Sequence, residues 1–331
     1  MQRDVKQILD KLTALGFGGG WETYLEPLSK SLKEGDNAQA IIKQGDGYRS
    51  IKFVLNIDKG ADGLSFPYYQ GTFIKVPAFE HKIISGIDTE ALEALMQRLN
   101  WKTDFVKLEE RLERIGKGNE ALLQSYHKAI ANLVMLSATE EGKVVSDALK
   151  IRYLLDMPYE QRYVGRDLEA KYAQGRMFFT DTASPFTKDE ASNLLEGRSI
   201  LKSYVDTEGN KQKYWMKATP GIENVEGEPF FFSGAKEFYP SYGLVSVLST
   251  LPMAFGAKEQ KLETLKSLQR GGLHEVAIVK NGKEEAYFIE ASPETKSIRI
   301  YDASMKAVTR REMLLGYKTV QERKRPKRPH L

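Results

Sequence analysis

The fold is decided by residues 38–76, which read AQAIIKQGDGYRSIKFVLNIDKGADGLSFPYYQGTFIKV. Between Ile51 and Ile57, apolar side chains occupy every second position, which is the period of a strand with one buried face. Turn signals containing glycine, at residues 45–47 and 60–63, divide the stretch into three extended segments. The stretch therefore predicts a three-stranded antiparallel meander.

Helices are expected on the N-terminal side of this meander. Apolar residues recur at helical spacing over residues 4–15, and Gly16 follows where a helix C-cap is expected. A second helix is expected over residues 22–33, and Gly35 ends it. The N-terminal unit is thus predicted to consist of helix, glycine and meander, in that order.

A similar unit recurs near the C-terminus. Residues 258–269 are expected to form a helix that ends at Gly271, and residues 274–305 are expected to form a second three-stranded antiparallel meander. Residues 277–280 read AIVK and echo AIIK at residues 40–43, with a glycine two positions later in both places. The shared order and the shared turns indicate a duplicated unit.

The sequence between the two copies predicts helices. Residues 88–155 are rich in Leu, Glu, Lys and Ala at helical spacing. These residues are expected to bury Leu92, Leu95, Leu99, Leu108, Leu112, Leu122, Ile130, Leu133 and Leu136. Thr187 and Glu190 then have the spacing of a capping box that opens a helix over residues 188–196. Residues 198–218 predict a β-hairpin with glycine at its turn.

The predicted fold class is therefore α+β, a duplicated unit of helix plus three-stranded antiparallel meander with a helical insertion between the copies. The expected segments are an N-terminal unit, a helical insertion, a C-terminal α+β domain and a basic tail, at residues 1–80, 81–184, 185–317 and 318–331. The insertion can be a separate domain or a lid over the sheets.

Composition excludes several classes of protein. The absence of cysteine excludes disulfide-linked partners and thiol nucleophiles and suits a reducing compartment. No signal-peptide layout is present and no apolar run has the length of a membrane span, so a cytoplasmic protein without a membrane partner is expected. The histidines lack metal-ligand spacing, and no metal or cofactor is expected; they are His81, His127, His274 and His330.

The net charge of +4 is concentrated at the C-terminus. Residues 306–331 carry nine Lys/Arg against two Glu, a net charge of +7, which leaves about −3 on the rest of the chain. Proline and high charge predict a disordered end at residues 318–331. Its basic side chains can contact the phosphates of a nucleic acid. They are Arg323, Lys324, Arg325, Lys327 and Arg328.

The predicted hairpin is a second candidate for nucleic-acid binding. Its aromatic residues Tyr214 and Trp215 can stack on nucleobases, because such side chains on strands are used in this way. Lysines that can hold phosphates lie beside them, at Lys202, Lys211, Lys213 and Lys217. The alternative is that the aromatic side chains fill the core, as they commonly do in strands.

No catalytic motif is present in the sequence. The serines lie in neither Gly-x-Ser-x-Gly nor Ser-x-x-Lys, so nucleophilic acyl transfer has no support. The leading hypothesis is a non-enzymatic accessory protein that binds nucleic acid or a protein partner. The alternative is an enzyme whose carboxylates and tyrosines come together from distant segments. Acidic groups with shifted pKa values in one cleft favour the enzyme, and a flat basic or aromatic face favours the binding protein.

Several stretches resemble a known family. They are EASNLLEGRS at residues 190–199, SLQRG at 267–271, and residues 208–210, 283–291 and 298–306. They are similar to an uncharacterised group of Bacteroidetes proteins, domain of unknown function 3945, which occurs with conjugative and other mobile genetic elements. The resemblance covers residues 4–76 and 186–308, whereas residues 82–180 depart from the pattern. It implies a mobile-element setting and supplies no catalytic residue.

Overall fold

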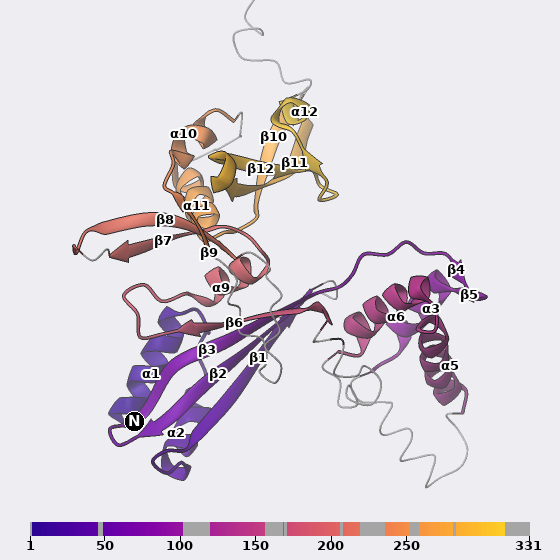
Figure 1. Cartoon of the computed structure of the whole chain (residues 1–331), viewed down its shortest axis with the longest axis horizontal. Helices are drawn as coiled ribbons and strands as arrows, with labels where there is room; N and C mark the ends of the chain where they lie inside the picture. The colour runs from indigo at the N-terminus through magenta and orange to yellow at the C-terminus, as the bar shows by residue number, and fades with distance from the viewer. Residues whose placement is uncertain are drawn as a thin grey trace, which may run out of the picture. The chain divides into compact units, whose positions relative to one another are not determined.

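The computed structural model describes most of the chain (Figure 1). The positions outside the described part are residues 1, 46–48, 102–119, 156–167, 169–170, 206–207, 219–235, 252–257, 281–282 and 315–331. The chain forms two compact units. Unit 1 comprises residues 1–40, 54–71 and 175–331, and unit 2 comprises residues 41–53 and 72–174. The four segments expected along the sequence stay a prediction.

The first sheet has four strands in the order β1-β2-β3-β6. The strands are β1 (Asn37–Gly45), β2 (Arg49–Gly60), β3 (Gly63–Lys75) and β6 (Ala173–Phe179). Connections of a few residues join β1 to β2 and β2 to β3, and such short connections join only antiparallel neighbours. The N-terminal meander is confirmed. β6 lies within the predicted helical insertion and was missed, although its Met-Phe-Phe end favours a strand.

Two helices precede this sheet, as predicted. They are α1 (Arg3–Ala14) and α2 (Glu22–Ser31). The apolar stripe of α1 is buried at Val5, Ile8 and Leu12. The carboxylate of Asp4 accepts a hydrogen bond from the backbone N–H of Leu64 at 2.9 Å. This bond is the main cause that lowers the pKa of Asp4, and it fixes the start of α1 against β3.

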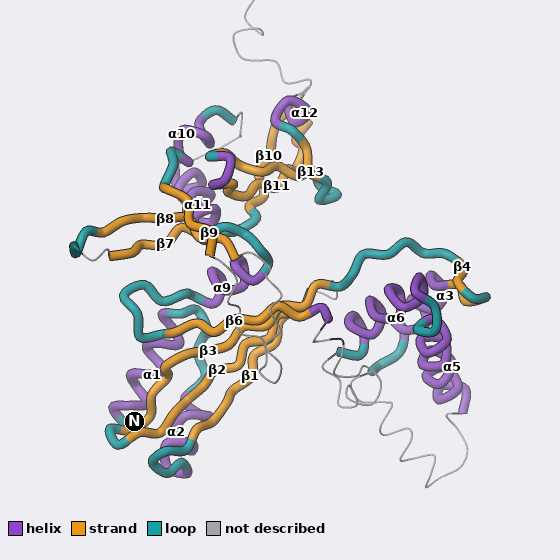
Figure 2. Tube along the Cα trace, viewed as in Figure 1, coloured by secondary structure: helices purple, strands orange, loops and turns teal. Residues whose placement is uncertain are grey.

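The predicted hairpin is confirmed as part of a second sheet (Figure 2). Its strands, β7 (Ile200–Val205) and β8 (Lys211–Ala218), are antiparallel. A third strand, β9 (Lys236–Pro240), pairs antiparallel with β8. The helix α10 (Leu244–Ser249) follows β9 in the chain. This sheet and α10 contribute Trp215, Leu244 and Leu248 to the core of the C-terminal part.

The C-terminal meander is confirmed as a third sheet. Its strands are β10 (His274–Lys280), β11 (Lys283–Ser292), β12 (Ser297–Tyr301) and the added β13 (Ala307–Val308), and all pairs are antiparallel. A 3-10 turn (Pro293–Thr295) joins β11 to β12, and the short helix α12 (Arg310–Leu314) follows β13. The α+β class is therefore established, whereas the equivalence of the two meanders by superposition stays a prediction.

Each meander follows a helix and a glycine with positive φ. α2 ends at Ser31 and Gly35 has φ 89°, whereas α11 (Lys258–Gln269) is followed by Gly271 with φ 80°. A Cβ atom on Gly271 would also lie 2.8 Å from Ile200 Cγ2 and 3.0 Å from the Ser199 carbonyl oxygen. Only glycine combines this backbone conformation with such a close approach.

Unit 2 has a helical core, as the composition predicted. α3 (Thr89–Arg98), α5 (Glu120–Leu136) and α6 (Glu140–Tyr153) follow the small hairpin formed by β4 (Ile83–Ile84) and β5 (Ile87–Asp88). Leu92, Leu99, Leu133 and Leu136 are buried, and Leu95 and Ile130 are partly buried against the same core. The prediction for Leu122 is wrong, because 39% of this residue is exposed on the first turns of α5. Leu108 and Leu112 lie outside the described residues.

The helices of the described part do not reach the dimensions of a membrane span. α5 has 17 residues and carries polar groups along its length. A helix that crosses a bilayer needs about 20 mainly apolar residues. Across the ranges that the structure describes, no helix is long and apolar enough to cross a membrane.

The predicted capping box opens α9 (Lys188–Leu195). The Thr187 hydroxyl accepts a hydrogen bond from the Glu190 N–H at 3.3 Å, and the Glu190 carboxylate accepts one from the Thr187 N–H at 3.0 Å. Both donors would otherwise lack a partner in the first turn of the helix. The side chain of Glu190 also pairs with Lys202 at 3.0 Å, so the box links α9 to β7.

Replacing Thr187 by alanine is expected to lower the free energy of unfolding by about 1 kcal/mol, because the Glu190 N–H loses its acceptor. Urea denaturation followed by circular dichroism measures this change. Thr187→Ser keeps the hydroxyl and should stay within a few tenths of a kcal/mol of the wild type. Equal destabilisation by alanine and serine would show that the hydroxyl does not stabilise α9.

Candidate functional site

The structure places the residues of the predicted hairpin site in different environments. Trp215 is 1% exposed, belongs to the C-terminal core and packs beside Tyr242 with ring centroids 5.6 Å apart. It is therefore not available to stack on a nucleobase, and the core alternative describes it correctly. Tyr214 is half-buried, whereas Lys211 and Lys213 are exposed on β8.

Two lysines of the predicted site form ion pairs within unit 1. Lys202 pairs with Glu190 at 3.0 Å, donates to the Pro185 carbonyl at 2.9 Å and lies 4.9 Å from the centroid of Phe186. Lys217 pairs with Glu294 at 2.9 Å. The positive charges of Lys202 and Lys217 are therefore paired with carboxylates of the same unit. The basic tail, with Arg323, Lys324, Arg325, Lys327 and Arg328, lies outside the described residues.

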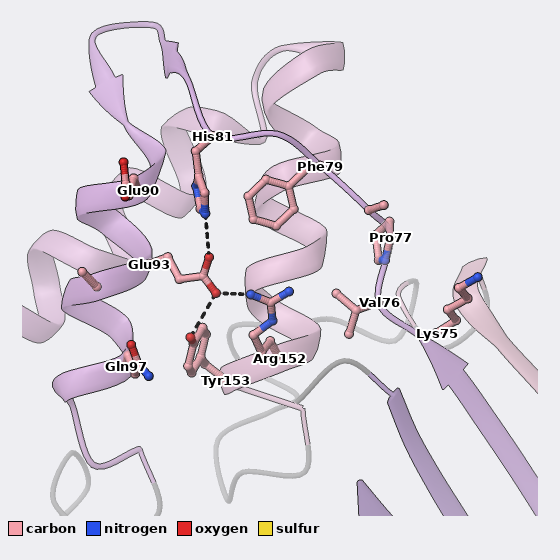
Figure 3. A pocket seen from close by; sticks show the side chains of 12 residues that line it. Lys75, Val76, Pro77, Phe79, His81, Glu90, Glu93, Gln97, Arg152 and Tyr153 are labelled. Carbon is pink, nitrogen blue, oxygen red and sulfur yellow. Dashed lines mark hydrogen bonds and ion pairs between the residues drawn. The ribbon is translucent and has the colours of Figure 1, made fainter. Parts of the chain in front are cut away.

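A pocket of about 880 Å³ lies within unit 2 (Figure 3). Its walls come from the end of β3 and the segment after it, from α3 and from the end of α6. The apolar part of the lining is formed by Val76, Pro77, Ala78, Phe79 and Ala94. The polar part is formed by Lys75, His81, Glu90, Glu93, Gln97, Arg152 and Tyr153. This volume and this mixed lining are typical of a site for a small molecule.

Glu93 is the centre of the polar lining (Figure 3). Its Oε1 atom forms an ion pair with Arg152 and accepts a hydrogen bond from the Tyr153 hydroxyl at 3.1 Å. Its Oε2 atom lies 3.1 Å from Nε2 of His81. The side chains of Glu93 and Arg152 are only 16% and 14% exposed, so these charge-assisted bonds are partly shielded from water. The carboxylate is thus held by three groups from two segments, because Arg152 and Tyr153 both lie at the end of α6 and His81 lies on the segment after β3.

The other groups around Glu93 are also fixed. The ring of Phe79 meets His81 edge to face, with centroids 5.1 Å apart, and the Arg152 guanidinium carbon lies 5.9 Å from the centroid of Phe79. The Thr89 hydroxyl donates to the Lys82 carbonyl at 2.9 Å, and its oxygen lies 3.4 Å from Nδ1 of His81. Thr89 is buried, so its hydroxyl is held in place beside the imidazole of His81.

Burial, followed by the nearby charge of Glu93, raises the pKa of Tyr153. The phenol therefore stays protonated and serves as a hydrogen-bond donor at neutral pH. The three partners occupy three of the about four acceptor positions of the carboxylate, two on Oε1 and one on Oε2. As arranged here, the pocket is suited to holding a ligand. Among the described residues, no group of three or more His, Asp or Glu side chains is placed to hold a metal ion.

The sequence pattern does not reveal this pocket. His81 lacks metal-ligand spacing, and Glu93, Arg152 and Tyr153 belong to no motif. Glu93 lies 59 positions from Arg152 and 12 from His81, so no local spacing connects them. The one local signal is the pair Arg152-Tyr153 at the end of a helix, where two polar groups follow an apolar stretch. Such a signal is too common to indicate a site.

A second feature lies on the first sheet, in unit 1. Tyr68 on β3 and Phe179 on β6 have ring centroids 6.2 Å apart at an interplanar angle of 57°. Phe179 is 57% exposed and Tyr68 is half-buried. The sequence pattern did not indicate Phe179, because β6 was not predicted.

Comparisons with known proteins give no family assignment and no relative. The resemblance stated from the sequence therefore stays a prediction. No family model, no curated protein and no solved structure matches this chain.

Proposed function

We propose that this protein is a non-enzymatic binding protein and that the pocket around Glu93 holds a small polar ligand. The observation that supports this proposal is the preformed network in which Arg152, Tyr153 and His81 hold the Glu93 carboxylate. A preformed network of this kind does not need to reorganise when a ligand enters, which favours binding. An accessory role in a mobile genetic element follows from the resemblance alone and is part of the same proposal.

The second candidate is an enzyme of the carboxylate and tyrosine type. It is favoured by one observation, the convergence of Glu93 and Tyr153 on one pocket. In this case the carboxylate would act as the base through the acceptor position that its three partners leave open. The two candidates differ in whether the bound molecule is recovered unchanged.

The proposal is tested on the full chain by native mass spectrometry after purification without denaturation. We expect a bound small molecule that is absent from the denatured spectrum. Arg152→Gln should reduce its occupancy strongly, because the guanidinium orients Glu93 and lines the pocket. Lys82→Gln is the matched control, since Lys82 pairs with Glu141 in the same unit and does not line the pocket.

Thermal melting gives an independent measurement with added compounds. A ligand at one hundred times its Kd is expected to raise the free energy of unfolding by about 2.7 kcal/mol. Amino acids, dicarboxylates, sugars and mononucleotides are suitable probes. If wild type and Arg152→Gln respond identically to every probe and retain the same bound mass, the pocket is not the binding site. Conversion of a probe into a product would favour the enzyme.

A further inference from the structure

The first sheet has two faces of different character. Along β2, Ile51, Phe53 and Leu55 are buried, whereas Lys52 and Val54 between them are half-buried. Because successive side chains of a strand point to opposite faces, Lys52 and Val54 belong to the face away from the core. The buried face also carries Phe66 and Tyr69, whose rings pack against Phe17, a residue that follows α1.

The alternation along β3 shifts by one residue at Pro67 and Tyr68. Phe66 and Tyr69 are both buried, and the two residues between them are half-buried. An extra residue in a strand has this effect, and proline in a strand is typical of such a position. Phe66 and Tyr69 therefore share the core face, and Tyr68 lies on the other face.

The last two residues of β6 also point to opposite faces of the sheet. Phe178 is 2% exposed and stacks on Tyr69, with centroids 5.1 Å apart and an angle of 21° between the rings. The next residue, Phe179, is 57% exposed. β3 and β6 are hydrogen-bonded neighbours, so Tyr68 and Phe179 lie next to each other on the outer face of the sheet. Burial of Phe178 and Tyr69 holds both outer rings in place.

We propose that Tyr68 and Phe179 form a stacking platform for the bases of single-stranded nucleic acid. Neighbouring strands that present aromatic rings on an open sheet face offer flat π-surfaces to successive unpaired bases. In a duplex these base faces are already stacked on one another, so the platform selects single strands. The proposal places nucleobase contact on the first sheet, not on the hairpin where the sequence suggested it.

The chemistry beside the two rings fits this partner. Gln70, at the next outward position along β3, is half-buried and can bond to base edges. Gln39 on β1 is exposed and donates to the buried Asn56 on β2 at 2.9 Å, so the Gln39 amide is the polar group there. A face with two aromatic rings and neutral polar neighbours fits unpaired bases better than an apolar protein partner.

The test is fluorescence anisotropy of a short fluorescein-labelled oligothymidylate with the full chain at low salt. Phe179→Ala is expected to weaken binding by about 5- to 100-fold, and Tyr68→Ala by a similar factor. Phe179→Tyr should bind like the wild type, because it keeps the ring. Ile83→Ala is the matched control, since Ile83 is 74% exposed and lies on β4 in unit 2.

Further measurements separate stacking from other causes. The melting temperature of Phe179→Ala should equal that of the wild type, because the side chain is largely exposed. Phe179→Leu keeps apolar area without a π-face and should bind as weakly as alanine. The proposal would be overturned by wild-type affinity in Phe179→Leu, or by affinity within twofold of the wild type in both alanine variants. Equal binding of duplex and single strand, or no binding at all, would also overturn it. The platform lies in unit 1, so its failure leaves the pocket in unit 2 untouched.

Discussion

Replacing Trp215 by alanine is expected to lower the free energy of unfolding by about 3–5 kcal/mol, which is among the largest effects of a single substitution in a core. Trp215 is 1% exposed and shares its core with Leu244, Ile278 and Ile289. These residues come from β8, α10, β10 and β11, so the indole joins the second and third sheets. Urea denaturation of the full chain measures the loss.

Trp215→Phe is the informative companion variant. The indole Nε1 is buried, and it has no hydrogen-bond partner among the described residues. Phenylalanine keeps an aromatic ring and removes this unpaired donor, so it should destabilise clearly less than alanine. Lys213→Ala, on the exposed part of the same strand, should leave stability within about 0.5 kcal/mol of the wild type. Wild-type stability of Trp215→Ala would contradict the core assignment and restore Trp215 as a surface residue.

Local signals in the sequence were sufficient to predict most elements of the fold. The alternation from Ile51 to Ile57, the box formed by Thr187 and Glu190, and the positive-φ glycine at Gly271 each act within a few residues. Such features report backbone preferences directly, which is why the meanders, the hairpin and α9 follow from them. The strands that were not predicted are β4, β5, β6, β9 and β13, because strands of two to seven residues carry little periodicity.

The candidate sites could not be predicted in the same way. Glu93 and Arg152 meet only through the packing of α3 and α6, and His81 reaches Glu93 from the segment before β4. Charged residues on helices usually face water. Residue types alone also could not show which members of the predicted hairpin site are accessible. Lysines beside aromatic residues on a strand indicate a nucleic-acid surface only if both are accessible, and Trp215 and Lys202 are not. Burial and pairing are long-range properties, so the sequence pattern does not contain them.

Deletion of residues 321–331 is expected to weaken nucleic-acid binding strongly and in a salt-dependent manner. The segment contains five Lys/Arg between Arg323 and Arg328. Each phosphate contact adds about 0.7–0.9 to the slope of log affinity against log salt, so the deletion should reduce the slope by at most about 3.5–4.5. Between two buffers that differ fourfold in salt, this difference corresponds to about two to three orders of magnitude in affinity.

The measurement is a salt titration of single-stranded and duplex DNA binding by the full-length and truncated chains. A full-length variant with the five basic residues changed to glutamine separates charge from length and should behave like the truncation. The melting temperature should not change, because a segment this polar contributes almost no buried apolar area. Phe179→Ala should instead lower affinity by a similar factor at every salt concentration, because stacking releases no counterions. The salt dependence therefore separates the contribution of the tail from that of Phe179. Equal slopes for the full-length and truncated chains would exclude a phosphate-binding role for the tail.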